Sequence, residues 1–325
     1  METFRTPVII PESADKINYQ TKCLFMGSCF ADSIGKIMAG YQFPALLNPF
    51  GTLFNPASIA ENLGLLICGK TFTRDDLRHH NDLWFSLNHY TAFSHPNPEA
   101  CLALVNQAAT GASSWLKDCH YLLLTFGTAW AYQFKETGKI VANCHKLPAS
   151  QFNQVLLQPA SIIDQYNQLL GKLKLLNPGI RVIFTLSPVR HWSNGAVGNQ
   201  LSKSVLHYSI HEILKKNDFA SYFPAYEIFM DELRDYRFYA GDMLHPSEQG
   251  TRYVWERFCN ARVEEAAKKI MAGVEAVFKA LNHRPLHTDT TNHKIFRSNT
   301  LKLIKRLREQ YPFLDFHNEI AQLQL

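Results

Sequence analysis

The pattern of apolar and polar positions divides residues 20–281 into buried strands that alternate with amphipathic helices. Continuous apolar runs at 23–26, 121–126 and 181–186 are bounded by turn-forming residues, which is typical of strands buried on both faces. Apolar residues recur with helical spacing over 29–39, 56–68, 100–116, 164–176, 200–216 and 247–281. This alternation predicts a mostly parallel sheet with helices on both faces, that is, a three-layer α/β/α sandwich.

In the remaining segments the pattern of apolar and polar residues is less regular. A hairpin is predicted over 129–135 and 139–142, and a last short strand at 222–226. Residues 283–298 are polar and rich in His, Thr and Asn, so we predict a linker there, followed by a basic amphipathic helix at 301–310. The expected organisation is a main domain over 1–282 and a helical C-terminal extension over 283–325, which docks on the domain or on a partner.

The turn at Gly27 and Ser28 stands where the first predicted strand passes into the first helix. Such a switch needs a residue that tolerates unusual backbone angles, and glycine does so without steric cost. Ser28 is therefore predicted at the carboxyl end of a strand and at a helix N-terminus, where open α/β sheets bind ligands. Two interpretations remain open: a plain N-cap, the common role of serine before a helix, or a functional hydroxyl.

Asp242 and His245 supply the partners that a nucleophilic serine requires. They are three residues apart and stand just before Ser247, which is predicted to cap the helix at 247–281. A serine hydroxyl needs an adjacent base, and a histidine base needs a third group to orient it. The alternative is that Asp242 caps a turn and His245 is an ordinary surface histidine.

Cys29 adjoins Ser28 and is a rival nucleophile. Successive helical positions diverge by about 100°, so one of the two side chains points away from the site. We predict that Cys29 is a buried small hydrophobe.

Composition narrows the class of protein. The chain has 325 residues, 46% hydrophobic and 19% charged, as in an ordinary globular protein. A net charge of +5, scattered along the sequence, does not favour nucleic acid as a partner, and no run is long enough for a membrane span. The first seven residues do not read as a signal peptide, and the seven cysteines form no CxxC pair, so we expect reduced thiols in the cytoplasm. No histidine has metal-ligand spacing, and no metal site is predicted.

A group of motifs resembles a known family. The stretch 27–31 reads Gly-Ser-Cys-Phe-Ala, the motif that gives the GSCFA family its name, and further motifs stand at 48–52, 125–130, 187–191 and 242–246. That family is similar to the SGNH (GDSL-like) hydrolases, which are esterases and lipases with a flavodoxin-like sandwich. The resemblance implies Ser28 as nucleophile, Asp242 as orienting acid and His245 as general base.

The resemblance also implies an oxyanion hole made by the N–H of the nucleophile, a glycine N–H and an asparagine side chain. Gly51 matches the glycine, and Ser28 supplies its own N–H. The strand expected to end in Gly-x-Asn-Asp ends instead in Gly127-Thr128-Ala129-Trp130. Thr128, a backbone N–H near Gly127, or Asn48 from its own loop would have to take the place of the asparagine.

Three further residues are predicted to line the substrate pocket with Asn48. Arg190 and His191 follow a predicted strand at the same sheet edge as Ser28 and would bind an anionic or polar group. Trp130 would stack on a sugar ring. A structural ion pair, a turn, or simple packing are the alternatives for these three.

The predicted function is hydrolysis of an ester, namely removal or transfer of a short acyl group on a carbohydrate or similar metabolite, with no cofactor. An acyltransferase would use the same three residues. A catalytically inactive module that binds a glycan or a protein is the alternative from a different class. The sequence leaves the oligomeric state open.

Overall fold

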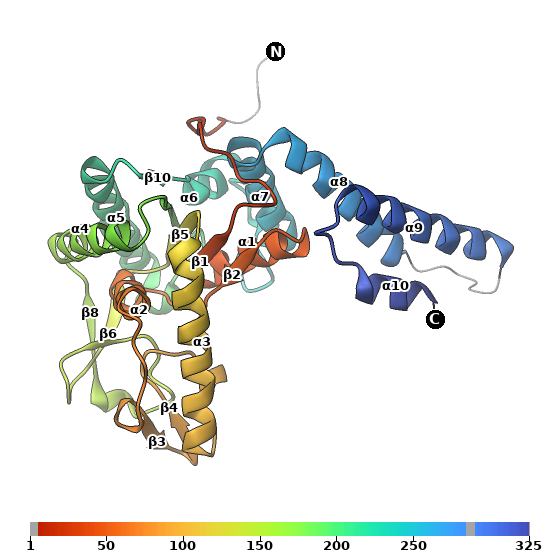
Figure 1. Cartoon of the computed structure of the whole chain (residues 1–325). Helices are drawn as coiled ribbons and strands as arrows, with labels where there is room; N and C mark the ends of the chain where they lie inside the picture. Colours follow the sequence, from red (N-terminus) through yellow and green to blue (C-terminus); the bar gives the residue numbers. More distant parts are fainter. Residues whose placement is uncertain (1–5, 284–289, 325) are drawn as a thin grey trace.

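A five-stranded parallel sheet forms the centre of the structure (Figure 1). Its strands lie in the order β10-β9-β5-β1-β2, and their bounds are β1 (Cys23–Gly27), β2 (Ala45–Leu47), β5 (Tyr121–Phe126), β9 (Arg181–Leu186) and β10 (Ala220–Tyr222). In sequence order this is the 2-1-3-4-5 arrangement of flavodoxin-like folds, whose direction of winding reverses between β1 and β5. The predicted α/β fold is confirmed.

The structure is a computed structural model and describes residues 6–283 and 290–324. The segment 284–289, within the predicted linker, lies outside the described residues. So do residues 1–5, where no signal peptide is predicted.

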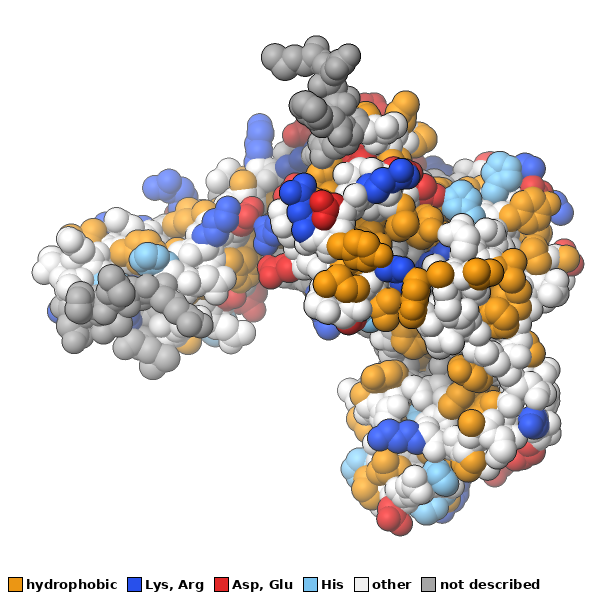
Figure 2. Space-filling model, turned by 180° about the vertical axis from the view of Figure 1, so that it is seen from behind, with side chains coloured by type: hydrophobic (Ala, Val, Ile, Leu, Met, Phe, Trp, Pro, Cys, Tyr) orange, Lys and Arg blue, Asp and Glu red, His pale blue; other side chains and the backbone are white. Residues whose placement is uncertain are grey.

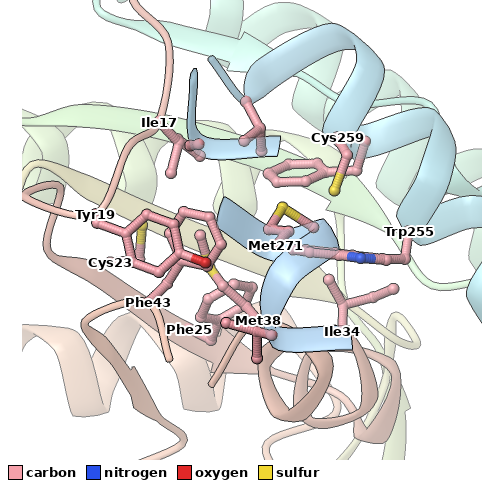
Figure 3. Packing of buried hydrophobic residues seen from close by; sticks show 14 of the residues in the cluster. Ile17, Tyr19, Cys23, Phe25, Ile34, Met38, Phe43, Trp255, Cys259 and Met271 are labelled. Carbon is pink, nitrogen blue, oxygen red and sulfur yellow. The ribbon is translucent and has the colours of Figure 1, made fainter. Parts of the chain in front are cut away.

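The central strands are apolar throughout because both of their faces are covered. All residues of β1 and β5 are buried, and successive side chains of β1 enter opposite core clusters. Phe25 belongs to one cluster with Met38 and Trp255, as Figure 3 shows, and Leu24 belongs to the other. Period-2 alternation is lost in such a strand, which is why a continuous apolar run predicted it correctly.

Helices form the two outer layers. The face of the first cluster is covered by α1 (Cys29–Gly40), α7 (Glu248–Arg262) and α8 (Glu265–Leu281). The opposite face is covered by α2 (Pro56–Ile67), α3 (Pro98–Asp118), α4 (Pro159–Leu176) and α5 (Gly195–Lys216). The three layers are those predicted.

The predicted single helix at 247–281 is wrong, because the structure has two helices there. Ser247 caps α7 as expected, with its Oγ accepting the N–H of Gly250 at 3.1 Å. After Arg262, however, Val263 becomes extended and pairs with Ile17 in a parallel bridge. The break is caused by a segment far away in sequence, which helical periodicity cannot reveal.

Two strand predictions also need correction. The last strand is β10 at Ala220–Tyr222, earlier than predicted, because Pro224 opens a helical segment made of α6 (Ala225–Glu227) and the π-helical η5 (Ile228–Glu232). The predicted hairpin is present as β6 (Trp130–Phe134) and β7 (Ile140–Val141), but its sheet contains an unpredicted third strand, β8 (Phe152–Leu156). A separate small sheet pairs β3 (Arg78–His80) with β4 (Leu83–Phe85).

The C-terminal extension is helical, as predicted, but the linker is shorter than 283–298 because α9 (Thr291–Gln310) begins inside it. The last helix is α10 (His317–Gln324). Figure 1 shows α8, α9 and α10 together at one side of the sandwich. Leu314 and Phe316 are buried in the same core cluster as α1 and α7, and Gln42 exchanges two hydrogen bonds of 2.6 Å with the backbone of Asp315. The extension therefore docks on the domain, while the boundary at 282/283 remains a prediction.

Removing the extension should destabilise the domain. A chain that ends at Leu281 loses the buried side chains of Ile304, Leu307, Leu314 and Phe316. Burial of each apolar side chain of this size contributes roughly 1.5–3 kcal/mol, so we expect the melting temperature to fall by about 10 °C or more. Thermal circular dichroism measures this, with the single change Phe316→Ala as a smaller step in the same direction. A truncated chain with the melting temperature of the full chain would show that these contacts add nothing to stability.

The charged side chains are spread over the surface, as their scattered positions in the sequence indicate. Figure 2 shows Lys, Arg, Asp and Glu side chains scattered over one face of the molecule without a large patch of one sign. Within the described residues, no helix is both long and apolar enough to cross a membrane.

Candidate active site

The turn at Gly27 places Ser28 at the carboxyl edge of the sheet, at the point where the winding reverses. Gly27 has φ 144°, and a Cβ there would lie 2.2 Å from the Thr125 carbonyl oxygen, so no other residue fits without displacing β5. The Ser28 N–H donates to the same oxygen at 3.1 Å. Ser28 is thus held between the ends of β1 and β5, as the sequence predicts.

The Ser28 side chain does not act as a helix cap. Its backbone angles are those of an N-cap residue, yet its Oγ forms no capping hydrogen bond. The residue is 2% exposed, and its Oγ has no hydrogen-bond partner anywhere in the described chain. A buried hydroxyl without a partner costs roughly 1–3 kcal/mol, which favours a functional role over the plain cap.

Gly127 provides the wall against which Ser28 lies. A Cβ at Gly127 would stand 3.2 Å from Ser28 Cβ and 2.8 Å from the Phe54 carbonyl oxygen. Close packing against Ser28 and Phe54 therefore favours a glycine at this position.

Asp242 and His245 form the pair that their spacing predicts. Asp242 Oδ2 lies 2.6 Å from His245 Nδ1, and Asp242 Oδ1 accepts the N–H groups of Leu244 at 2.9 Å and of His245 at 3.0 Å. Met243 adopts φ 59°, an unusual angle for a non-glycine residue. This tight turn lets one carboxylate hold both the backbone and the ring of the histidine.

The protonation of the pair follows from these bonds. Three hydrogen bonds to the carboxylate, those from the N–H groups of His245 and Leu244 first, lower the pKa of Asp242 to about 2. Because the carboxylate only accepts, we assign the proton to Nδ1 of His245, which leaves Nε2 with a free lone pair. Nε2 is therefore the ring nitrogen that Asp242 does not engage.

The structure does not bring His245 into hydrogen-bond contact with Ser28. The loop of His245 lies at the end of β9, where the Arg190 N–H donates to the Leu244 carbonyl at 3.1 Å. Its side chain is 49% exposed, whereas Ser28 Oγ is buried and unbonded. Both residues lie at the carboxyl edge of the sheet, and their direct contact remains a prediction.

The backbone donors predicted for an oxyanion hole are already engaged. The Ser28 N–H is bonded to Thr125, the Gly51 N–H donates to Asn48 O at 2.7 Å, and the N–H groups of Gly127 and Thr128 both donate to Phe54 O at 2.9 Å. The Thr128 hydroxyl is shared with Ser202 Oγ at 3.1 Å. Sequence order placed these residues near Ser28 but could not show where their N–H groups point.

Asn48 is the donor that remains. Its Oδ1 accepts the Gly27 N–H at 2.9 Å, so its amide group lies beside the turn at Gly27 and Ser28. Its Nδ2 is buried and has no hydrogen-bond partner among the described residues. Asn48 thus presents an unused donor next to Ser28, as one of the alternatives from the sequence proposed.

The structure places Arg190, His191 and Trp130, all predicted for the substrate pocket, in different surroundings. Arg190 lines a cavity of about 330 Å³, stacks on Trp192 at 4.0 Å and donates to the Met243 carbonyl at 3.2 Å. His191 accepts or donates a 2.8 Å bond with Ser193 Oγ, and burial lowers its pKa. Trp130 is not in this cavity: its indole N–H donates to Gly198 O at 3.0 Å, which ties β6 to α5. This hydrogen bond gives Trp130 a role in packing β6 against α5.

Cys29 is half-buried, and burial raises the pKa of its thiol. A thiol that stays protonated at neutral pH is a poor nucleophile, so Ser28 is the better candidate. Groups of three or more His, Cys, Asp or Glu side chains suited to a metal ion do not occur in the described part of the chain.

Sequence reasoning missed Lys203. This residue of α5 is buried, and its Nζ donates to the carbonyl oxygens of Gly127 and Ser187, both at 2.7 Å. The sequence feature that could have identified Lys203 was its position on the buried face of the helix, in register with Leu206 and Ile210. A charged residue at such a position is unusual and marks a site worth inspection.

Comparison with solved structures finds carbohydrate esterases among the matches. A carbohydrate esterase of family 3 from Talaromyces cellulolyticus is 8% identical, with 79% of this chain and 99% of that chain covered at a TM-score of 0.35. An acetyl xylan esterase (Est2A) from the rumen bacterium Butyrivibrio proteoclasticus is 11% identical, with 74% of this chain and 64% of that chain covered at a TM-score of 0.38. A search among curated proteins gives no match.

Family profiles give a firmer result. Residues 274–325 match the C-terminal domain of GSCFA domain proteins. Residues 22–258, which contain the whole central sheet together with Ser28, Asp242 and His245, match the GSCFA family. The chain therefore belongs to the GSCFA family.

Proposed function

We propose that this protein is a serine hydrolase that cleaves an ester, a short acyl group on a carbohydrate or similar metabolite. The observation that carries the proposal is the Asp242–His245 pair, in which a 2.6 Å bond to Nδ1 leaves Nε2 as a base. The buried and unbonded hydroxyl of Ser28 supports it, because such a group is otherwise a net cost to folding.

In the proposed reaction Ser28 Oγ attacks the ester carbonyl while His245 Nε2 takes its proton. Asp242 keeps the imidazole in the required tautomer and stabilises the imidazolium that forms. Asn48 Nδ2 donates to the carbonyl oxygen as it becomes an oxyanion. The proton then passes to the leaving alcohol, and water releases the acyl group from Ser28 by the same steps in reverse.

The proposal requires the half-exposed imidazole to turn toward Ser28 when substrate enters, and hydrogen bonds in an empty site often form only with substrate bound. The lack of contact between Ser28 and His245 also favours a second candidate: a binding module that keeps the fold without catalysis.

Labelling with a fluorophosphonate probe separates the two candidates. A hydrolase should react with the probe, and peptide mass spectrometry should place the phosphonyl group on Ser28. Labelling should disappear in Ser28→Ala and persist in Cys29→Ala. An unlabelled, folded wild-type chain would reject the hydrolase and leave the binding module.

A further prediction concerns Asn48. The change Asn48→Asp keeps an oxygen to accept the Gly27 N–H but removes the Nδ2 donor. We expect kcat on an activated ester to fall about 100-fold with KM little changed, because loss of one oxyanion donor typically costs ~100- to 1000-fold. Steady-state kinetics measure this, with Asn62→Asp, a buried asparagine that bonds Asn88 instead, as the matched control. An Asn48→Asp enzyme with wild-type kcat would remove Asn48 from the oxyanion hole.

A further inference from the structure

Lys203 carries a buried amine at the carboxyl edge of the central sheet. Its side chain projects from α5, and the residue is 2% exposed. Its Nζ joins the carbonyl oxygens of Gly127 and Ser187, at 2.7 Å each. These are the first residues after β5 and β9, so one amine ties together the ends of two adjacent strands.

This position is a costly one for a charge. Burial lowers the pKa of Lys203 to about 7, and the group that opposes this effect is the thiol of Cys29 rather than a carboxylate. Of the neighbouring buried positions on α5, Leu206 and Ile210 are apolar, whereas Asn199 and Ser202 are polar but uncharged. A methionine would fill the same space without the desolvation cost, but it would leave the carbonyl oxygens of Gly127 and Ser187 without this donor.

The amine lies beside the candidate nucleophile. Gly127, whose carbonyl it binds, packs against Ser28, where a Cβ on the glycine would come within 3.2 Å of the serine Cβ. Cys29, the residue after Ser28, interacts electrostatically with Lys203. In low-dielectric surroundings such a charge acts more strongly on a developing negative charge than it would in water.

The resemblance to SGNH hydrolases implies an oxyanion asparagine after β5, and this chain has Thr128-Ala129-Trp130 there. The backbone N–H groups of Gly127 and Thr128 are bonded to Phe54 and cannot replace it. Lys203 brings a cation to the same strand end from a helix that the motif does not include.

We propose that Lys203 is a positioning residue of this site, whose ammonium group holds the ends of β5 and β9 against Ser28 and keeps a positive charge beside the place where the oxyanion forms. The proposal rests on the proposed function for the oxyanion itself. The charge beside Ser28 does not depend on that function.

The groups around Lys203 differ in their protonation near neutral pH. Burial raises the pKa of Cys29 on α1 and of Tyr226 on α6, and it lowers the pKa of His191 after β9. These three groups therefore stay neutral at pH 7. His207, farther along α5, is ion-paired with a glutamate, whose hydrogen bond raises its pKa. The ammonium of Lys203 is present below its pKa and lost as pH rises through it, so kcat should fall on the alkaline side.

Two substitutions test this expectation through the pH profile of kcat. Lys203→Met should lower kcat roughly 10- to 100-fold with KM within about twofold, and the alkaline fall should vanish. Lys203→Arg keeps a charge that does not titrate, so activity should persist and the alkaline fall should again be absent. Lys203→Arg also provides the test if the Met variant fails to fold. An alkaline fall retained at the same pH in the folded Arg variant, or wild-type kcat in the folded Met variant, would overturn the proposal.

A second measurement is independent of esterase activity. Alkylation of Cys29 by iodoacetamide, followed residue by residue with mass spectrometry at a pH below about 7, where Lys203 carries its charge, requires the thiolate. Loss of the nearby cation should slow it several-fold in Lys203→Met, while Lys216→Met, an exposed position on the same helix, should leave it unchanged. If wild-type protein neither turns over ester nor labels at Ser28, the proposed function fails. Slower alkylation in Lys203→Met would still show that the ammonium group of Lys203 lies close to Cys29. An unchanged alkylation rate would overturn that placement.

Discussion

Replacing either Ser28 or His245 with alanine should abolish ester hydrolysis. Ser28→Ala removes the proposed nucleophile, and His245→Ala removes the proposed base, which Asp242 holds by a 2.6 Å bond. In a well-studied serine protease, loss of either residue costs about a million-fold in kcat. We expect a loss of at least about 10,000-fold here, measured as kcat/KM on p-nitrophenyl acetate.

The double variant sharpens this test. Because the two residues act as one unit, the loss in Ser28→Ala/His245→Ala should be close to that of either single change rather than their product. Matched controls are Cys29→Ala, which removes the rival nucleophile, and His317→Ala, which removes an exposed histidine beside another aspartate. Turnover that survives in Ser28→Ala and disappears in Cys29→Ala would reassign the nucleophile to the thiol.

The sheet was predictable because its strands are defined locally. Continuous apolar runs at β1, β5 and β9 are buried on both faces, and the register pairs them in parallel over nearly their full length, for example Leu24 with Leu122. The break between α7 and α8 was not predictable, since it depends on Ile17, which pairs with Val263 from the other end of the chain. A local pattern cannot report a contact over that separation.

The site was predictable in part for similar reasons. Asp242 and His245 are three residues apart, so their pairing is a local property of a turn. Asn48 was one of several alternatives, and only the unpaired Nδ2 in the folded chain distinguishes it from Gly51, whose N–H is already bonded. Lys203 comes from a distant helix and carries no motif, so its place beside Gly127 becomes visible only in the fold.

The role of Asp242 can be tested by an isosteric change. In Asp242→Asn the side-chain oxygen can still accept the N–H groups of Leu244 and His245, which keeps the turn. The new amide would face Nδ1 as a donor, so the imidazole must carry its proton on Nε2 and can no longer act as a base. The same isosteric change costs about 10,000-fold in a well-studied triad. Here the backbone hydrogen bonds retain part of the orientation, and we expect a loss on the order of 100- to 1000-fold in kcat/KM.

Asp315→Asn is the matched control, because Asp315 also caps a turn, accepting the His317 N–H at 3.0 Å, and stands 3.9 Å from that ring. Circular dichroism should show that both variants fold like the wild type. Since three hydrogen bonds hold the pKa of Asp242 near 2, its carboxylate stays ionised throughout an assay at pH 5–9, and the aspartate adds no step to the wild-type pH profile. A folded Asp242→Asn enzyme with near wild-type kcat/KM would remove Asp242 from the mechanism, and its carboxylate would then serve only the turn that carries His245.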